Sequence, residues 1–150
     1  MTFPSHPEAA ATSRGGGTGI TAAILALLGG LFHLIGVAGG AVMLAGDDDL
    51  ARGLLTFATH LVLAAALLTG GVGLILPREF GRAATIAGSA AALTVYLLVL
   101  VLGAFGVYFL GLVDGDVPLV YVAVLCVPAA GTLVLASLPP TGRWVARGWS

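Results

Sequence analysis

The chain has 150 residues, of which 59% are hydrophobic and only 9% are charged, and its formal net charge is −1. Because soluble domains carry about a quarter charged residues, this composition excludes a soluble globular protein. The six arginines are divided among several segments and form no basic stripe, so we expect no nucleic-acid partner.

The first 18 residues differ from the rest of the chain in composition. They are rich in Pro, Ser, Gly and Ala. A segment of this kind offers too little apolar surface to form a packed core. We therefore predict a disordered cytoplasmic tail over residues 1–18.

Four long stretches of the chain contain no Asp, Glu, Lys or Arg. They are residues 15–46, 53–77, 83–113 and 117–142. Each exceeds the roughly 20 apolar residues that a helix needs to cross the hydrocarbon core of a bilayer. We predict a membrane domain over residues 19–142, with transmembrane helices at about 19–46, 53–77, 83–113 and 118–138.

The basic residues between the predicted spans predict the orientation in the membrane. With the N-terminus in the cytoplasm, the outer side carries Arg52 alone. The cytoplasmic side then carries Arg14, Arg78, Arg82, Arg143 and Arg147. Because cytoplasmic loops are enriched in Lys and Arg, we predict that both termini are cytoplasmic. The absence of Lys, Asn and Gln indicates a GC-rich bacterial genome and hence the bacterial inner membrane.

The short connections between the spans predict how the helices are arranged. They favour antiparallel neighbours, so the expected fold is an all-α integral membrane protein with an up-down-up-down bundle of four transmembrane helices. Small residues on the helix faces allow close approach of backbones in a membrane. The glycines that we expect to pack helices together are Gly29, Gly30, Gly36, Gly40, Gly88, Gly103 and Gly106.

A proline within the last predicted span and two tryptophans beyond its end predict local features of the chain. Pro128 lies in the middle of the span and is expected to kink it. Residues 143–150 place Trp144 and Trp149 beside arginines. Since indole rings prefer the headgroup level, we predict a cytoplasmic tail that lies along the membrane interface.

His33 and His60 are the only ionisable groups inside the spans that point toward the bundle interior. Such groups are functional candidates because their burial in a membrane is costly. One hypothesis is a haem b with one axial histidine from each helix. Counting from the predicted span ends at residues 46 and 53, however, separates the two histidines by about 9 Å in depth. That separation disfavours a shared haem and direct proton transfer.

A second hypothesis makes the two histidines part of a proton relay or a quinone pocket, together with Thr56, Thr59 and Tyr96. A third treats each as a neutral imidazole that is hydrogen-bonded to a neighbouring helix. Such bonds contribute about 0.6 kcal/mol on average in measured membrane proteins. The sequence leaves all three interpretations open.

Five aspartates fall in the two predicted outer loops and could converge on a cation. They are Asp47, Asp48, Asp49, Asp114 and Asp116. Carboxylates suit hard cations such as Ca²⁺ and Mg²⁺. The orientation rule already explains why these loops lack basic residues, so solvated acidic loops are the alternative to a metal site.

No recognised catalytic motif is present in the sequence: HExxH, GxSxG and the P-loop pattern are all missing. We expect a non-enzymatic membrane protein without a required cofactor, an accessory or scaffold subunit of a larger complex. Its partners would be the lipid bilayer and other membrane subunits or further copies of the chain. The alternatives are a redox or proton-handling subunit built on His33 and His60, and a small oligomeric transporter.

Overall fold

A computed structural model describes residues 16–46, 49–110 and 119–148, and all regular secondary structure in these ranges is helical. The helices are α1 (Gly16–Gly46), α2 (Leu50–Ile75), α3 (Glu79–Ala104), α4 (Leu119–Ser137) and α5 (Pro139–Arg147). The first four are long and apolar enough to cross a membrane. This confirms the predicted all-helical chain with four candidate membrane spans.

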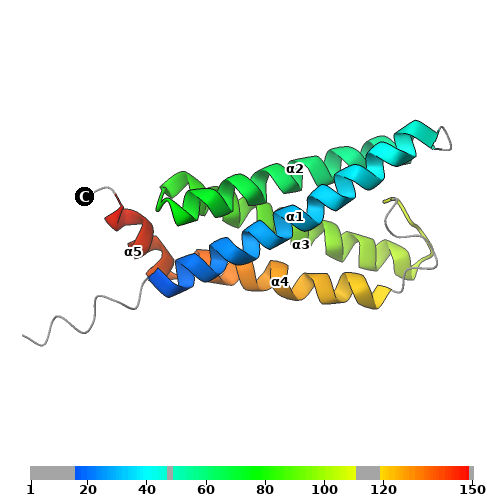
Figure 1. The fold of residues 1–150 in the computed structure, drawn as a ribbon. Coiled ribbons are helices and arrows are strands. Elements are labelled where there is room, and N and C mark those ends of the chain that lie inside the picture. Colours follow the sequence, from blue (N-terminus) through cyan, green and yellow to red (C-terminus); the bar gives the residue numbers. More distant parts are fainter. Residues whose placement is uncertain (1–15, 47–48, 111–118, 149–150) are drawn as a thin grey trace, which may run out of the picture.

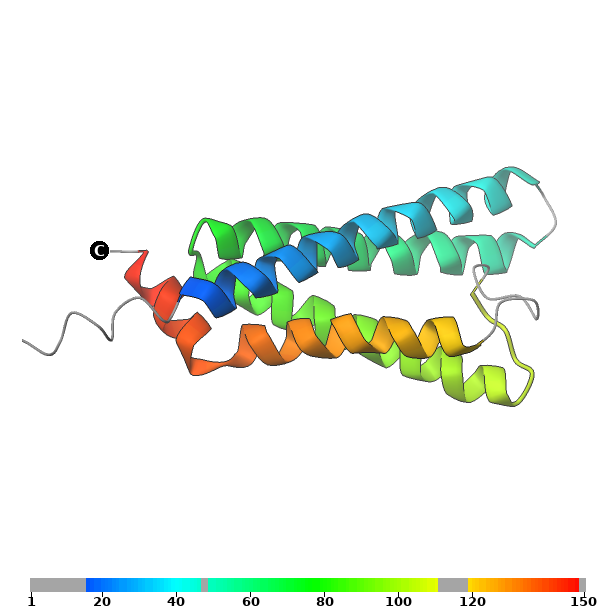
Figure 2. The ribbon, with the colours of Figure 1, turned by 60° about the horizontal axis from the view of Figure 1, so that its bottom comes forward.

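The four long helices form a bundle, and the short helix α5 lies across one end of it (Figures 1 and 2). We call this the α5 end, and the opposite end, where α2 begins, the far end. The helices α1 to α3 pack more deeply than α4. In the most apolar 18-residue window of each helix, 33–44% of residues are buried for α1 to α3, against 17% for α4.

The small residues on α1 face α2 at very short range. A Cβ atom placed on Gly40 would lie 2.6 Å from the backbone nitrogen of Phe57. A Cβ atom on Gly30 would lie 2.6 Å from Cγ of Leu68. Positions late in α1 therefore face positions early in α2, so these two helices run antiparallel. The absent side chains allow the backbones to approach this closely.

The closest approach between α2 and α3 lies near the α5 end. A Cβ atom on Gly73 would lie 2.5 Å from Cα of Gly81, and one on Gly70 would lie 2.6 Å from the backbone nitrogen of Thr85. Further along, a Cβ atom on Gly88 would meet Ala66 at 3.1 Å. Small residues thus hold α3 against α2 over about two helical turns.

Several helix ends differ from the predicted spans. At two of them, polar backbone contacts determine where the helix begins or ends. The Asp49 carboxylate accepts a hydrogen bond from the backbone N–H of Arg52 at 3.0 Å and so caps α2. The helix therefore begins at Leu50, three residues before the predicted start. At the end of α3, Gly106 has φ +76° and the N–H of Val107 donates to the Leu102 carbonyl at 2.9 Å. These are the features of a Schellman motif.

The prediction that Gly106 packs helices together was therefore wrong. It lies outside α3, and a Cβ atom placed on it would meet no atom of the described residues within 4 Å. Glycine is favoured there because a positive φ is costly for residues with a Cβ atom. Gly103, by contrast, is buried within α3.

The α5 end is held together by side chains that bond to helix carbonyls. The Trp144 indole N–H donates to the Leu74 carbonyl at 3.2 Å, and Arg82 donates to the carbonyls of Ala136 and Ser137 at 2.9 and 3.1 Å. Carbonyls at helix ends lack intrahelical partners. Trp144 thus packs against the bundle as part of α5, in a region that we predicted as an interfacial tail; Trp149 lies outside the described residues.

Candidate functional site

The two intramembrane histidines contact each other in the middle of the bundle. Nδ1 of His33 lies 2.8 Å from Nδ1 of His60, and Nε2 of His33 lies 3.1 Å from the hydroxyl of Tyr96. Only 1%, 5% and 8% of the surfaces of His33, His60 and Tyr96 are exposed. The three side chains form one buried hydrogen-bonded chain that joins α1, α2 and α3.

The depth difference of about 9 Å that we expected between the histidines was wrong. His33 lies 13 residues before the end of α1, and His60 lies 10 residues after the start of α2 at Leu50. This offset of three residues corresponds to about 4.5 Å, which two imidazole side chains can bridge. The error arose because Arg52 was placed in a loop, whereas Asp49 caps the helix ahead of it.

A glycine makes room for the His60 ring. A Cβ atom placed on Gly36 would overlap the imidazole of His60. His33 also stacks on Tyr96, with ring centroids 5.9 Å apart and an interplanar angle of 14°, and meets Phe32 edge-on. The orientation of the hydrogen-bonded chain is therefore fixed by packing as well as by its own bonds.

The chain of hydrogen bonds has two possible polarities. If Nδ1–H of His33 donates to His60, then Nε2 of His33 is bare and accepts from the Tyr96 hydroxyl. If Nδ1–H of His60 donates instead, then Nε2–H of His33 donates to the Tyr96 oxygen. Both nitrogens of His33 are satisfied in either case. Switching from the first polarity to the second moves one proton along each bond, away from Tyr96 and toward His60.

The spacing of the two rings does not fit a haem held between them. Metal–imidazole bonds are about 2.0 Å long, so an iron with one axial histidine on each side would separate the two nitrogens by about 4 Å. The facing nitrogens are 2.8 Å apart and the ring centroids 5.0 Å apart. The nitrogen separation is that of a hydrogen bond.

Further polar side chains, all buried except the half-buried Arg52, continue from the histidines toward both ends of the bundle. On α2, Arg52, Thr56 and His60 follow one another at intervals of four residues and so share a helix face. On α3, Thr85 and Ser89 lie on the Tyr96 side and are buried. At 1.5 Å per residue, these two rows together cover about 28 Å along the bundle, close to the roughly 30 Å of a hydrocarbon core.

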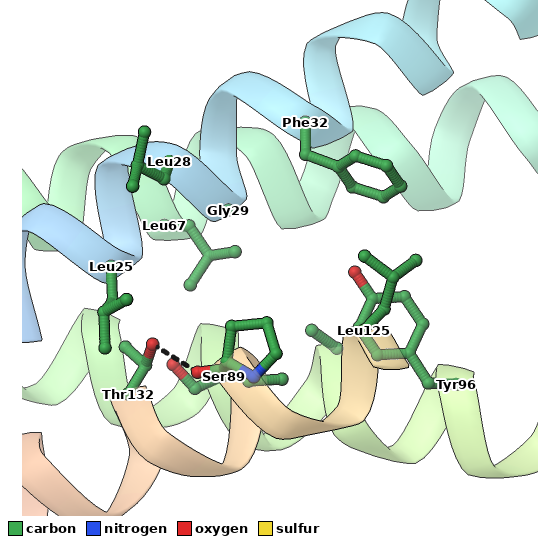
Figure 3. A pocket seen from close by; sticks show the side chains of 12 residues that line it. Leu25, Leu28, Gly29, Phe32, Leu67, Ser89, Tyr96, Leu125 and Thr132 are labelled. Carbon is green, nitrogen blue, oxygen red and sulfur yellow. Dashed lines mark hydrogen bonds between the residues drawn. The ribbon is translucent and has the colours of Figure 1, made fainter. Parts of the chain in front are cut away.

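Two cavities lie on either side of Tyr96, between α4 and the other helices. The first, of about 200 Å³, lies toward the α5 end and includes Ser89 and Thr132 in its wall. Figure 3 shows its lining side chains around the space between α1, α3 and α4. The second, of about 360 Å³, includes His60 and Tyr121 in its wall and lies toward the far end. Tyr96 lines both cavities and His60 lines only the second, so the hydrogen-bonded chain begins at the first cavity and ends at the second.

Most of the remaining predicted site residues lie outside the hydrogen-bonded chain of Tyr96, His33 and His60. Thr56 is fully buried one turn from His60, while Thr59 is half-buried. Of the five aspartates, Asp49 caps α2, and the other four lie outside the described residues. Within the described ranges no three His, Cys, Asp or Glu side chains gather into a group that could hold a metal. The outer cation site stays a prediction.

Ser89 is a site residue that the sequence analysis missed. It is 1% exposed, and within the described part of the chain its hydroxyl has no hydrogen-bond partner. The sequence carried a signal for it, because Thr85, Ser89 and Tyr96 share one face of a largely apolar helix. No protein-family model, curated protein or solved structure significantly matches the chain.

Proposed function

We propose that this chain is a non-enzymatic, proton-handling membrane protein whose relay is Tyr96–His33–His60. The observation that carries the proposal is the continuous pair of hydrogen bonds at 3.1 and 2.8 Å, buried at the centre of four apolar helices. An imidazole can accept a proton on one ring nitrogen and release another from the second. His33 has a partner on each of its nitrogens, which is the arrangement that such a transfer requires.

The route of the proton follows from the polarity of the two hydrogen bonds that join Tyr96, His33 and His60. Tyr96 passes its hydroxyl proton to His33 and takes up another proton in its place. The phenol therefore ends with the same number of protons. His33 passes its Nδ1 proton to His60, and His60 releases its Nε2 proton on the side of the second cavity. One pass moves one proton from the first cavity to the second through three side chains, none of which is a carboxylate. Both imidazoles then have to return to their first tautomers before the next proton can follow.

Proton flux into liposomes tests this proposal. The full chain is reconstituted with a pH-sensitive dye inside, and a potassium diffusion potential drives the protons. We expect flux above that of protein-free liposomes, and a fall to that background in Tyr96→Phe and His33→Gln. Tyr96→Phe removes one hydroxyl and keeps the stacked ring.

Tyr108→Phe is the matched control. Tyr108 follows α3, is 37% exposed and takes no part in the relay. Its variant should conduct like the wild type. Wild-type flux at background, or Tyr96→Phe flux equal to that of the wild type, would contradict the proposal.

We also propose that the bundle crosses a bacterial inner membrane in up-down-up-down order with the α5 end and both termini in the cytoplasm. The support is the arginine bias of the sequence. Arg78, Arg82, Arg143 and Arg147 lie at or beside the α5 end, whereas Arg52 lies at the far end. A fluorescent protein fused to the C-terminus should fluoresce, and alkaline phosphatase at the same site should be inactive. The opposite pair of results would reverse the orientation.

A second candidate is an accessory subunit of a larger complex, or a transporter assembled from several copies. The shallow burial of α4 favours it, because this helix leaves Val124, Val127 and Val134 at least 58% exposed. Extraction in native lipid discs, followed by mass measurement of the particle, tests it. A particle that contains a single chain and lipid would count against both forms of this candidate.

A further inference from the structure

We infer that the first cavity is a binding site for the ring of a membrane-soluble para-quinone, held by a hydrogen bond from Ser89. The binding site rests on the cavity and on the Ser89 hydroxyl, which has no hydrogen-bond partner among the residues that the structure describes. Only its connection to proton movement rests on the proposed function.

The size and the walls of the cavity match a single six-membered ring. Its volume is about 200 Å³, and a cavity of about 150 Å³ in a protein core is known to bind benzene. The lining is almost wholly apolar, with Leu25, Leu67, Ala92 and Leu125 among its residues. Such a lining favours an apolar ring over a cluster of water molecules, since buried water needs two to four polar partners.

Ser89 gives the site its chemical specificity. A buried hydroxyl without a partner costs free energy unless something bonds to it. The other hydroxyl in the wall, on Thr132, donates to the Pro128 carbonyl at 2.7 Å. The Ser89 O–H is thus the available donor, and a quinone carbonyl is an acceptor. A hydrocarbon chain of a lipid would fill the space but leave Ser89 unpaired.

The cavity is placed for entry from the membrane and for contact with the relay. Leu28 lines it and is 58% exposed on the outer face of α1, so its mouth lies where lipid tails would surround the bundle. Tyr96 lines the other end, two helical turns from Ser89 along α3. The row of polar side chains is interrupted between Ser89 and Tyr96, and the ring would occupy this interruption.

Direct binding of a labelled quinone tests the inference. The full chain in lipid nanodiscs is titrated with tritiated decyl-benzoquinone in a scintillation proximity assay, with empty nanodiscs as the blank. We expect saturable binding. Unlabelled decylbenzene, which has the same tail and ring size but no oxygen, should compete at least fivefold more weakly, because one neutral hydrogen bond is lost.

Two variants and their controls locate the site. Ser89→Ala should raise the Kd about fivefold, whereas Ser137→Ala removes an exposed hydroxyl outside the cavity and should leave it unchanged. Ala129→Phe fills the cavity from α4 and should abolish binding. Ala123→Phe places the same ring on the exposed side of α4 and should bind like the wild type.

The outcomes separate this inference from the proposed function, because the assay uses no proton gradient. Absence of saturable binding, equal competition by decylbenzene, or an unchanged Kd in Ser89→Ala would overturn the quinone site and leave any measured proton flux standing. Saturable binding with the expected variant effects would establish the site even if the relay variants conduct normally.

Discussion

Replacing Gly36 with Ala should damage the histidine pair more than any other single methyl group. The new Cβ atom would overlap the His60 ring, so the ring has to move, and a shift of about 1 Å lengthens the 2.8 Å contact beyond the 3.5 Å limit of a hydrogen bond. Overpacking costs about 1–3 kcal/mol, and the lost bond costs about 1 kcal/mol. The better helix propensity of alanine returns up to about 1 kcal/mol. We expect a net loss of about 2 kcal/mol in the free energy of unfolding.

The assay is reversible unfolding of the full chain in mixed micelles, followed by circular dichroism. Gly131→Ala is the matched control, because its Cβ atom would meet nothing nearer than 4.0 Å and should be neutral or stabilising. Nitrogen-15 NMR of labelled histidine gives a second readout, since the wild type should show coupling across the N–H···N bond and Gly36→Ala should not.

A double-mutant cycle decides whether the mechanism is right. In a His60→Ala background the ring is gone, so Gly36→Ala should no longer destabilise, giving an interaction free energy of about 1–3 kcal/mol. If Gly36→Ala is as harmless as Gly131→Ala in the wild type, or costs the same with and without the His60 ring, the reasoning is refuted.

Three further predictions concern helix ends and can be checked by the same unfolding assay. Asp49→Ala removes the N-cap of α2 and should cost about 1 kcal/mol, whereas an unchanged midpoint would mean that the cap contributes nothing. Gly106→Ala forces a Cβ atom into a backbone with φ +76° and should cost about 1–2 kcal/mol, although no atom of the described residues lies within 4 Å of that Cβ position; stabilisation would contradict the Schellman assignment. Trp144→Phe keeps the packed ring but loses the bond to the Leu74 carbonyl and should cost about 1 kcal/mol; equal stability would show that only packing holds α5.

The sequence located the candidate site but misjudged its geometry. Helical periodicity placed His33 and His60 on small-residue faces, and both are buried. Their contact depended on where α2 begins, and a charge-free run is a poor guide to a helix start. Arg52 can lie inside α2 for two reasons. The Asp49 cap starts the helix ahead of Arg52, and the Arg52 guanidinium donates to the Leu110 carbonyl at 3.2 Å.

The sequence by itself determined the class of the protein and its four apolar helices, because the cost of charge in hydrocarbon acts on composition alone. It also placed His33 and His60 on interior faces, because 3.6-residue periodicity is local. Only the tertiary structure decided that Tyr96, His33 and His60 form one hydrogen-bonded chain and that Ser89, beside a cavity, has no partner in the described part of the protein. These features depend on the axial register between helices and on the loose packing of α4. The hydrogen bonds of this chain join residues 27 and 63 positions apart in the sequence, so no local pattern specifies them.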